Sequence, residues 1–205
     1  MSLIKKDLIS SSKYSLKCPY EMKPIGIAIH NTCNDASAKN EISYMKSNNN
    51  QVSYHVAIDD IEAIQAIPFN RNAWACGDGG SGSGNRKYIS IEICYSKSGG
   101  SKFDKAEKLA AKVVAEICKS YGWGIDKVKA HRDFAKKDCP HRTNMASFKN
   151  LVKSELDAPS KPSDSQSNVM YRVCVGSYSD KANAEEQQKK LLAKGFDSFL
   201  VAYNK

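Results

Sequence analysis

Strand-like apolar runs alternate with helical patterns up to residue 157, and this alternation constrains the fold more than any other feature of the chain. Helical spacing of apolar residues is clearest from Asp104 to Tyr121, where Gly122 follows as a stop signal, and it recurs at residues 35–47 and 145–156. The Asp59-Asp60 pair between two strand-like runs predicts a hairpin. We therefore expect an α/β fold with a mixed central β-sheet flanked by helices. The runs that predict strands lie at residues 25–29, 52–58, 62–67, 88–95 and 128–131.

A Ser- and Pro-rich segment, APSKPSDSQSN at residues 158–168, contains no large apolar side chain and is typical of a linker. It predicts one domain at residues 1–157 and a smaller unit at residues 169–205. The smaller unit is expected to be a βαβ unit, with strand, helix and strand at residues 171–176, 180–194 and 196–202.

Composition narrows the class of protein. The chain has 205 residues, of which 41% are hydrophobic and 26% charged, as in globular domains. Its net charge of +9 suits a polyanionic partner, but no basic block stands out, so binding to nucleic acid is not favoured. No apolar run approaches the roughly 20 residues that span a bilayer, so no membrane insertion is expected.

The N-terminal segment and the cysteines bear on the cellular compartment. Residues 1–20 include Lys5, Lys6 and Asp7 followed by three serines, and they lack the continuous apolar stretch of a secretory signal. Seven cysteines, an odd number without a CxxC pair, make a poor disulfide framework. We therefore expect a protein that is made in the cytoplasm and keeps its thiols reduced.

Two of the four histidines stand at the ends of predicted strands. His30 follows the run at 25–29, and His131 ends the run at 128–131, eight residues before Cys139. Side chains at the ends of neighbouring strands can converge, and two imidazoles with one thiolate leave a fourth tetrahedral position for water, as in a catalytic zinc site. On spacing alone, two hydrogen-bonded histidines and a buried free cysteine remain the alternative.

Four ordered motifs carry a resemblance to a known family, namely IAIHNT at 27–32, VSYHVAID at 52–59, ISIEIC at 89–94, and KAHRD at 129–133 leading to KDCP at 137–140. Through them, the first domain resembles the zinc-dependent N-acetylmuramoyl-L-alanine amidases of the type shared by phage endolysins, bacterial autolysins and peptidoglycan recognition proteins. The resemblance implies a mixed sheet flanked by helices, with His30, His131 and Cys139 as the ligands of Zn²⁺. It also implies that three further residues stand around the metal, namely Tyr54, Glu92 and Lys137.

Each of these three residues has a chemical role that its type permits. Partial burial of Glu92 would raise its pKa towards the range useful for taking a proton from the attacking water and passing it to the leaving amine. Lys137 would place an ammonium on the developing oxyanion, and Tyr54 would hydrogen-bond the water or the substrate carbonyl. The alternatives are an outward-facing strand residue for Glu92, a solvated lysine beside Lys136, and a core aromatic for Tyr54.

The loop at residues 68–86 is too long to serve only as a connection, so we expect it to cover a site. Trp74, Asn85 and Arg86 are candidates for substrate binding, with ordinary surface-loop residues as the alternative. Relatives commonly have a histidine directly after the tryptophan, where this chain has Ala75. That histidine is not a metal ligand, so the difference concerns substrate contacts.

The remaining histidines and cysteines are expected to be structural. His55 points to the opposite strand face from Tyr54, and the resemblance gives His141 no ligand role. The other cysteines are expected to be small buried apolar residues, among them Cys33, Cys94 and Cys118.

The C-terminal unit, beginning with YRVCVGSY at 171–178, resembles the first half of a SPOR domain, a module that binds bacterial cell-wall glycan. A full module has two βαβ halves, and the sequence shows one. A lone two-stranded unit has exposed edges and little core, so it needs a partner surface. We expect a homodimer in which two copies pair through this unit, with docking against the chain's own first domain as the alternative.

Together these resemblances predict a peptidoglycan hydrolase, an endolysin or autolysin that cleaves the amide between N-acetylmuramic acid and the L-alanine of the stem peptide. Without a secretory signal, it is expected to reach the cell wall through holin-type release. The alternatives are a cytosolic muropeptide-recycling amidase and a non-catalytic peptidoglycan-recognition module. The cell-wall-binding unit argues against the first alternative, and the retained Cys139 argues against the second.

Overall fold

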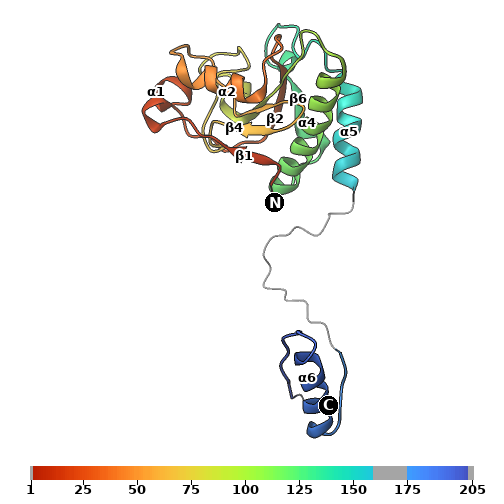
Figure 1. The fold of residues 1–205 in the computed structure, drawn as a ribbon. Helices are drawn as coiled ribbons and strands as arrows, with labels where there is room; N and C mark the ends of the chain where they lie inside the picture. Colours follow the sequence, from red (N-terminus) through yellow and green to blue (C-terminus); the bar gives the residue numbers. More distant parts are fainter. Residues whose placement is uncertain (1, 159–174, 203–205) are drawn as a thin grey trace. The chain divides into compact units, whose positions relative to one another are not determined.

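The computed structural model describes residues 2–158 and 175–202, and the chain divides between residues 163 and 164 into two compact units (Figure 1). The linker predicted at 158–168 lies almost entirely outside the described residues. Its boundaries therefore stay a prediction.

The first unit is built on one mixed six-stranded sheet, which confirms the predicted fold class (Figure 1). The strands lie in the order β1-β4-β3-β5-β2-β6, with β3 and β4 antiparallel and the other neighbouring pairs parallel. Because β5, β2 and β6 run parallel, their carboxyl ends lie at the same end of the sheet. The strands are β1 (Ile4–Lys6), β2 (Gly26–Asn31), β3 (Val56–Ile58), β4 (Ala63–Gln65), β5 (Tyr88–Ile93) and β6 (Val128–Ala130).

Helices cover both faces of this sheet. Helices α4 and α5 pack side by side over one face, and α2 covers the other (Figure 1). The two faces follow from strand alternation, since Val56 and Ile58 pack in the cluster under α4, whereas Ala57 between them packs in the cluster under α2. The helices of this unit are α1 (Tyr14–Lys17), α2 (Ala38–Ser47), α3 (Ser83–Lys87), α4 (Gly100–Tyr121) and α5 (Met145–Asp157), with 3₁₀ turns at Ser11–Lys13, Ile125–Lys127 and His131–Asp133.

Helix α4 confirms the helix predicted from Asp104 to Tyr121, which has the clearest helical spacing in the sequence. Gly122 follows it with a φ of +66°, the left-handed conformation that glycine adopts without strain, so the predicted stop is confirmed too. No helix in the described part of the chain is both long and apolar enough to cross a bilayer. The apolar face of α4 is buried against the sheet and α5, and it includes Phe103, Ala106, Ala110, Val113, Val114 and Ile117.

Helices α1 and α3 were not predicted, and two parts of the sheet also differ from the sequence prediction. Strand β3 covers only Val56–Ile58 of the predicted run 52–58, because the Tyr54 N–H bonds to the Met45 sulfur at 3.4 Å instead of to a neighbouring strand. Strand β1 was not predicted. Two of its three residues are lysines, and its pairing with β4 is a tertiary effect that local propensity does not show.

A lysine of the N-terminal segment, Lys17, holds the loop at residues 48–52 in place by hydrogen bonds. Lys17, at the end of α1, is fully buried, and its Nζ donates to Asn48 Oδ1 at 2.9 Å and to the carbonyls of Asn50 and Val52. Burial lowers the pKa of this amine, and Lys13 adds to the effect. The ammonium therefore holds the loop at residues 48–52 against the N-terminal segment.

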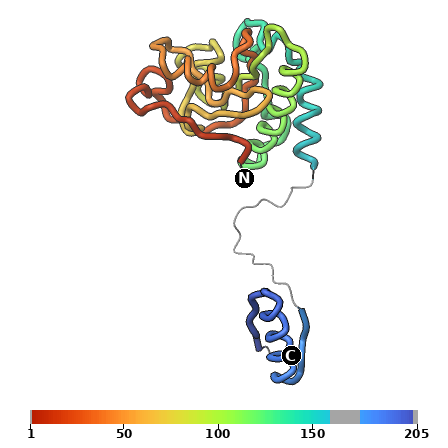
Figure 2. Tube along the Cα trace, viewed as in Figure 1, coloured from red at the N-terminus to blue at the C-terminus, as the bar shows by residue number. Residues whose placement is uncertain are grey.

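The C-terminal unit contains helix α6 (Lys181–Leu192) as its one regular element within residues 175–202 (Figures 1 and 2). Asp180 caps the helix by accepting the Ala182 N–H at 2.9 Å, and Gly195 follows it with a φ of +82°, which confirms the predicted helix and its stop. The strand predicted at 196–202 is wrong. A strand exists only when it is paired, and its expected partner at 171–176 lies mostly outside the described residues.

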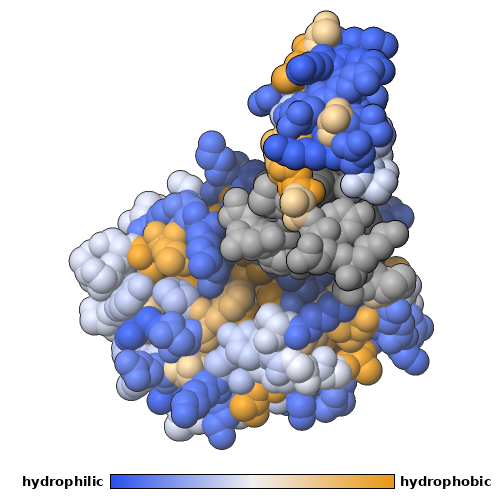
Figure 3. Space-filling view, turned by 90° about the horizontal axis from the view of Figure 1, so that it is seen from below, coloured by the Kyte–Doolittle hydropathy of each residue, from blue (hydrophilic) through white to orange (hydrophobic). Residues whose placement is uncertain are grey.

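This unit buries little of its apolar surface. No residue of α6 is buried, and the apolar side chains that follow it are exposed, with Phe196 at 62% and Val201 at 52%. Figure 3 shows hydrophobic residues at the surface of this unit. The described part of the unit therefore has no core comparable to that of the first unit.

Candidate metal centre and active site

The carboxyl ends of β2, β5 and β6 set the position of the candidate site. In register, His30 of β2 lies beside Glu92 of β5, and Ile29 pairs with Ala130 of β6. His131 directly follows β6 and so comes next to His30. Parallel strands thus bring together residues that are about a hundred positions apart in the chain.

The three predicted metal ligands come together at this end of the sheet. One donor atom from each of His30, His131 and Cys139 lies within 4.8 Å of the others, and all three residues are buried. His30 Nδ1 is 2.9 Å from His131 Nδ1 and 3.9 Å from Cys139 Sγ. A tetrahedral zinc ion with ordinary bond lengths would set these separations at about 3.4 and 3.6 Å, so the donor set and its spacing fit zinc.

The protonation of these groups suits a metal. Burial is the main cause that holds the pKa of His30 well below its usual value, with His131 and Lys137 adding to the effect, so the imidazole is neutral at pH 7. Burial also lowers the pKa of His131. Burial raises the pKa of the Cys139 thiol to about 11, while the Asn31 backbone N–H opposes the rise. A bound cation would favour the thiolate, because a coordinating thiol is deprotonated outright.

Asn31 and Arg132 hold the segment that carries Cys139. The Asn31 Oδ1 accepts the backbone N–H groups of Arg142 at 2.9 Å and Thr143 at 3.1 Å, and Nδ2 donates to Thr143 Oγ1. The Arg132 backbone N–H donates to the Cys139 carbonyl at 2.9 Å. These bonds tie the segment to the end of β2 and to the turn after β6. Sequence reasoning missed both supports, although each directly follows a predicted histidine ligand.

Glu92 points a carboxyl group into the same region. Its side chain is half-buried, and Oε2 is buried without a hydrogen-bond partner among the described residues. Burial raises the pKa of Glu92 to about 8, Glu41 adds to the rise, and Lys137 opposes it. A carboxyl group with a pKa close to neutrality can both take up and release a proton, as a general acid/base must.

A cavity of about 310 Å³ joins the three ligand residues and Glu92 to Tyr54, Lys137, Ala75 and Glu41. Tyr54 donates its hydroxyl to Glu41 Oε2 at 3.1 Å, and burial raises the pKa of this phenol, with Glu41 contributing. Lys137 is exposed at the rim. Sequence reasoning missed Glu41, because the pattern of α2 marks it only as a polar neighbour of buried Ile42.

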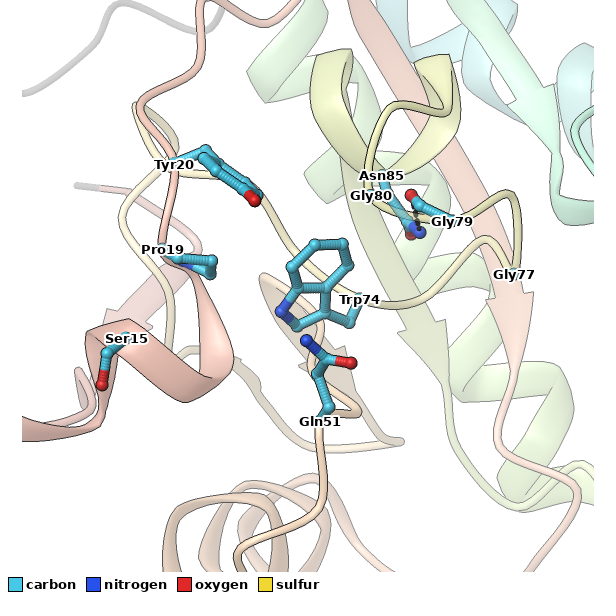
Figure 4. Close-up of a pocket in the computed structure, with 9 residues that line it drawn as sticks. All are labelled: Ser15, Pro19, Tyr20, Gln51, Trp74, Gly77, Gly79, Gly80 and Asn85. Atoms are coloured by element: carbon cyan, nitrogen blue, oxygen red, sulfur yellow. Dashed lines mark hydrogen bonds between the residues drawn. The ribbon is translucent and has the colours of Figure 1, made fainter.

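Trp74, Asn85 and Arg86 lie around a second cavity, of about 560 Å³ (Figure 4). Trp74 and Asn85 line it, and the Arg86 guanidinium stands 3.9 Å from the centroid of the Tyr20 ring, which also lines it. The side-chain amide of Asn85 accepts two backbone N–H groups and donates to one carbonyl within residues 75–79. Asn85 therefore fastens the loop that borders both cavities.

Among the described residues, the other histidines and cysteines follow the sequence predictions with one exception, and Cys174 lies outside them. Both ring nitrogens of His55 are bonded to backbone groups, so its structural role is confirmed. Cys94 and Cys118 are buried, as predicted. The prediction for Cys33 is wrong, because its backbone turns left-handed after β2, with a φ of +58°, and leaves the side chain exposed with Sγ 3.3 Å from His141 Nδ1.

Comparisons with known families agree with this geometry. A family model described as N-acetylmuramoyl-L-alanine amidase matches residues 20–142. A second, described as SPOR domain, matches residues 144–202. The second match begins at α5, which packs on α4 in the first unit, and extends through α6.

Individual relatives give the same answer. The chain is 55% identical over 163 residues to N-acetylmuramoyl-L-alanine amidase CwlA of Bacillus subtilis strain 168, covering 80% of this chain and 60% of that protein. It is 39% identical over 211 residues to N-acetylmuramoyl-L-alanine amidase CwlA of a Bacillus species, covering 98% of this chain and 84% of that protein. The solved structure of PlyL matches with a TM-score of 0.72 and 53% identity, covering 74% of this chain and 98% of that one. The chain thus spans less than two thirds of the Bacillus subtilis relative.

Proposed function

Because the chain belongs to the N-acetylmuramoyl-L-alanine amidase family, we propose that it hydrolyses the amide bond between the lactyl group of N-acetylmuramic acid and the L-alanine of the stem peptide in bacterial peptidoglycan. The observation that carries the proposal is the convergence of His30, His131 and Cys139 beside the unpartnered carboxyl oxygen of Glu92 in one cavity. A module that only recognises the wall has no use for a carboxyl group with a pKa close to neutrality beside a set of metal ligands.

His30, His131 and Cys139 are the residues that would hold a zinc ion in this proposal, with a fourth position left open. When bound, the ion supplies a nucleophile at neutral pH by lowering the pKa of water, and it polarises the scissile carbonyl. The protein contributes two imidazoles that are neutral at pH 7 and a thiol on a segment held by hydrogen bonds.

Glu92 carries the proton in this proposal. Its Oε2 accepts a proton from the attacking water and passes it to the nitrogen of L-alanine as the amide bond breaks. The pKa of about 8 keeps both the uptake and the release of this proton accessible near neutral pH.

Lys137 and Tyr54 act on the substrate in this proposal. The Lys137 ammonium at the rim stabilises the negative charge that develops on the carbonyl oxygen. Tyr54 already donates its one hydroxyl proton to Glu41, so its oxygen is left to accept a hydrogen bond from water or from a substrate N–H. This arrangement disfavours the substrate carbonyl as its partner, because a carbonyl only accepts.

Digestion of purified, sugar-intact peptidoglycan tests the proposal. We expect mass spectrometry to find free stem peptides with an L-alanine amino terminus, lost with a zinc chelator and restored by added zinc. The Cys139→Ala variant is expected to leave the wall intact. Cys118→Ala, which also removes a buried thiol but on α4, is its matched control. Intact wall despite tight binding would reject the amidase and favour a recognition module, and cleavage that survives chelation would reject zinc.

For the C-terminal unit we propose binding to cell-wall glycan and pairing of two copies. The match to the SPOR domain supports the first, and the exposed Phe196 and Val201 support the second, because a contact between copies would remove them from water. Light scattering at micromolar concentration is expected to give twice the chain mass of 22.6 kDa. A monomer mass would reject the dimer. Action at the wall after holin-type release stays a prediction.

A further inference from the structure

We propose that the cavity beside Trp74 binds an uncharged N-acetylated sugar of the glycan strand while the scissile amide occupies the neighbouring metal site. The inference rests on the proposed amidase function and adds a second binding site to it. The cavity, of about 560 Å³, falls in the size range of ligand sites and has no role in the chemistry described above.

The two cavities share walls, so one polymer can occupy both. Ala75 lines the cavity at the metal ligands, and Trp74 directly before it lines the second cavity. On another wall, Gln51 lines the second cavity while its two neighbours in sequence line the first. Gly77 also lines the second cavity, and a Cβ built on it would lie 3.6 Å from His131 Nε2. The backbone at residue 77 thus borders the second cavity and lies close to a metal-ligand residue.

The lining of the second cavity has the chemistry of a sugar site. Among the described residues, the nine that line it include aromatic rings, amides, a hydroxyl and glycines but no charged side chain (Figure 4). The nearby Arg86 guanidinium stacks on the Tyr20 ring and donates to the Gly80 carbonyl. A sugar ring offers an apolar C–H face to an aromatic ring, and its hydroxyl and acetamido groups pair with amides. The stem peptide carries carboxylates and an amine, and those suit the first cavity, which Glu41, Glu92 and Lys137 line.

Trp74 is held in place before any sugar arrives. Its Nε1 donates to the Leu16 carbonyl at 3.1 Å, its backbone N–H donates to Ser53 Oγ at 2.9 Å, and its ring meets the Tyr20 ring edge-on at 6.0 Å. In Figure 4 the indole stands between Tyr20 and the amide of Gln51. A ring fixed in this way loses little conformational entropy when it binds a ligand.

Gly80 gives a way to fill the cavity without strain. A Cβ on Gly80 would lie 4.0 Å from Trp74 Cη2, an ordinary contact distance, and the backbone there does not have a positive φ. Gly80→Leu therefore adds a side chain inside the cavity. Ser81→Leu is the matched control, because it adds the same side chain at an exposed neighbour that does not line the cavity.

The test compares two synthetic substrates with the same stem peptide, one on a single N-acetylmuramic acid and one within a tetrasaccharide. For the full chain with zinc, we expect kcat/KM to favour the tetrasaccharide by about tenfold. Gly80→Leu and Gln51→Ala are expected to bring the ratio of kcat/KM for the two substrates towards one, mainly by raising KM for the tetrasaccharide. Ser81→Leu is expected to leave this ratio at its wild-type value. A wild-type ratio near one, or an equal loss on both substrates in Gly80→Leu, would overturn the sugar site.

Binding of chitotetraose, followed by tryptophan fluorescence, separates this inference from the proposed function, because chitotetraose has no stem peptide to release. Binding that Gly80→Leu weakens, without cleavage of either substrate, would keep the sugar site and reject the amidase. Cleavage of both substrates at the same rate, with chitotetraose binding unaffected by Gly80→Leu, would keep the amidase and reject the sugar site. In a third comparison, two single-sugar substrates differ only in the length of the stem peptide. A preference between them that Gly80→Leu removes would assign the cavity to peptide and overturn the inference.

Discussion

The two units of this chain use their apolar residues in opposite ways. In the first unit, the apolar faces of the sheet and of α4 are buried against each other, and polar side chains are held out of water at the end of β2. In the C-terminal unit, α6 buries none of its residues and the apolar side chains after it face solvent. Rigid burial suits chemistry that needs shifted pKa values, whereas exposed apolar surface suits attachment. Substitutions at buried polar sites of the first unit should therefore have the largest effects.

Loss of a metal ligand should have the largest effect. Cys139→Ala removes a thiol that lies 3.9 Å from His30 Nδ1, so we expect zinc content well below one per chain and activity at background. Metal analysis of the purified protein together with release of stem peptides would show it. Full zinc content in this variant would mean that Cys139 is not a ligand.

Glu92→Gln should separate metal binding from chemistry. The amide cannot take up a proton, so kcat is expected to fall by about 10²- to 10⁴-fold while zinc content stays at the wild-type level. Single-turnover rates on a muropeptide, measured beside metal content, test this. Wild-type turnover would remove Glu92 from the mechanism.

Phe148→Ala should show how much the first unit depends on its core. Phe148 of α5 is fully buried in the cluster under α4, so its truncation is expected to lower the free energy of unfolding by about 3–5 kcal/mol. Urea denaturation followed by circular dichroism gives this value. A loss under 1 kcal/mol would mean that α5 is not part of the stabilising core.

Glu92 also predicts a pH dependence of stability for the zinc-free protein. Its pKa is about 8 in the folded chain against an ordinary value of 4.5, so the stability it contributes is fully present below pH 4.5 and lost as the pH rises through 8. Glu92→Gln should therefore gain in Tm relative to the wild type between about pH 5 and pH 9. Parallel melting curves whose separation does not change with pH would contradict the shift.

Phe196→Ala should have the smallest effect on folding and is the counterpart of Phe148→Ala. Its side chain is already exposed in the C-terminal unit, so the free energy of unfolding of the first unit is expected to change by less than about 0.5 kcal/mol. Its effect should appear instead in the dimer dissociation constant measured by sedimentation. A large loss of stability of the first unit would break the contrast between the two units.

The candidate site was predictable where polar residues end apolar runs, and not where it depends on packing. His30 and His131 each stand at the end of a short apolar run, a pattern visible in the sequence, whereas Glu92 lies within its strand and was expected at the site from the family resemblance. Glu41 reaches the cavity only because α2 packs over the sheet, and no local pattern shows that. The strand expected at 196–202 shows a second limit, since the strand-like pattern there does not form a strand in the described residues.

Lys17 lies ahead of the segment that matches the amidase family, yet its buried ammonium holds the loop at residues 48–52, which borders both cavities. The segment that the family model covers therefore does not include every residue that holds the cavity walls in place. A lytic fusion trimmed to start at residue 20 would retain each proposed ligand and proton carrier, but the wall of its substrate groove would lose this anchor. Engineers who exchange such catalytic modules should keep the N-terminal segment with them.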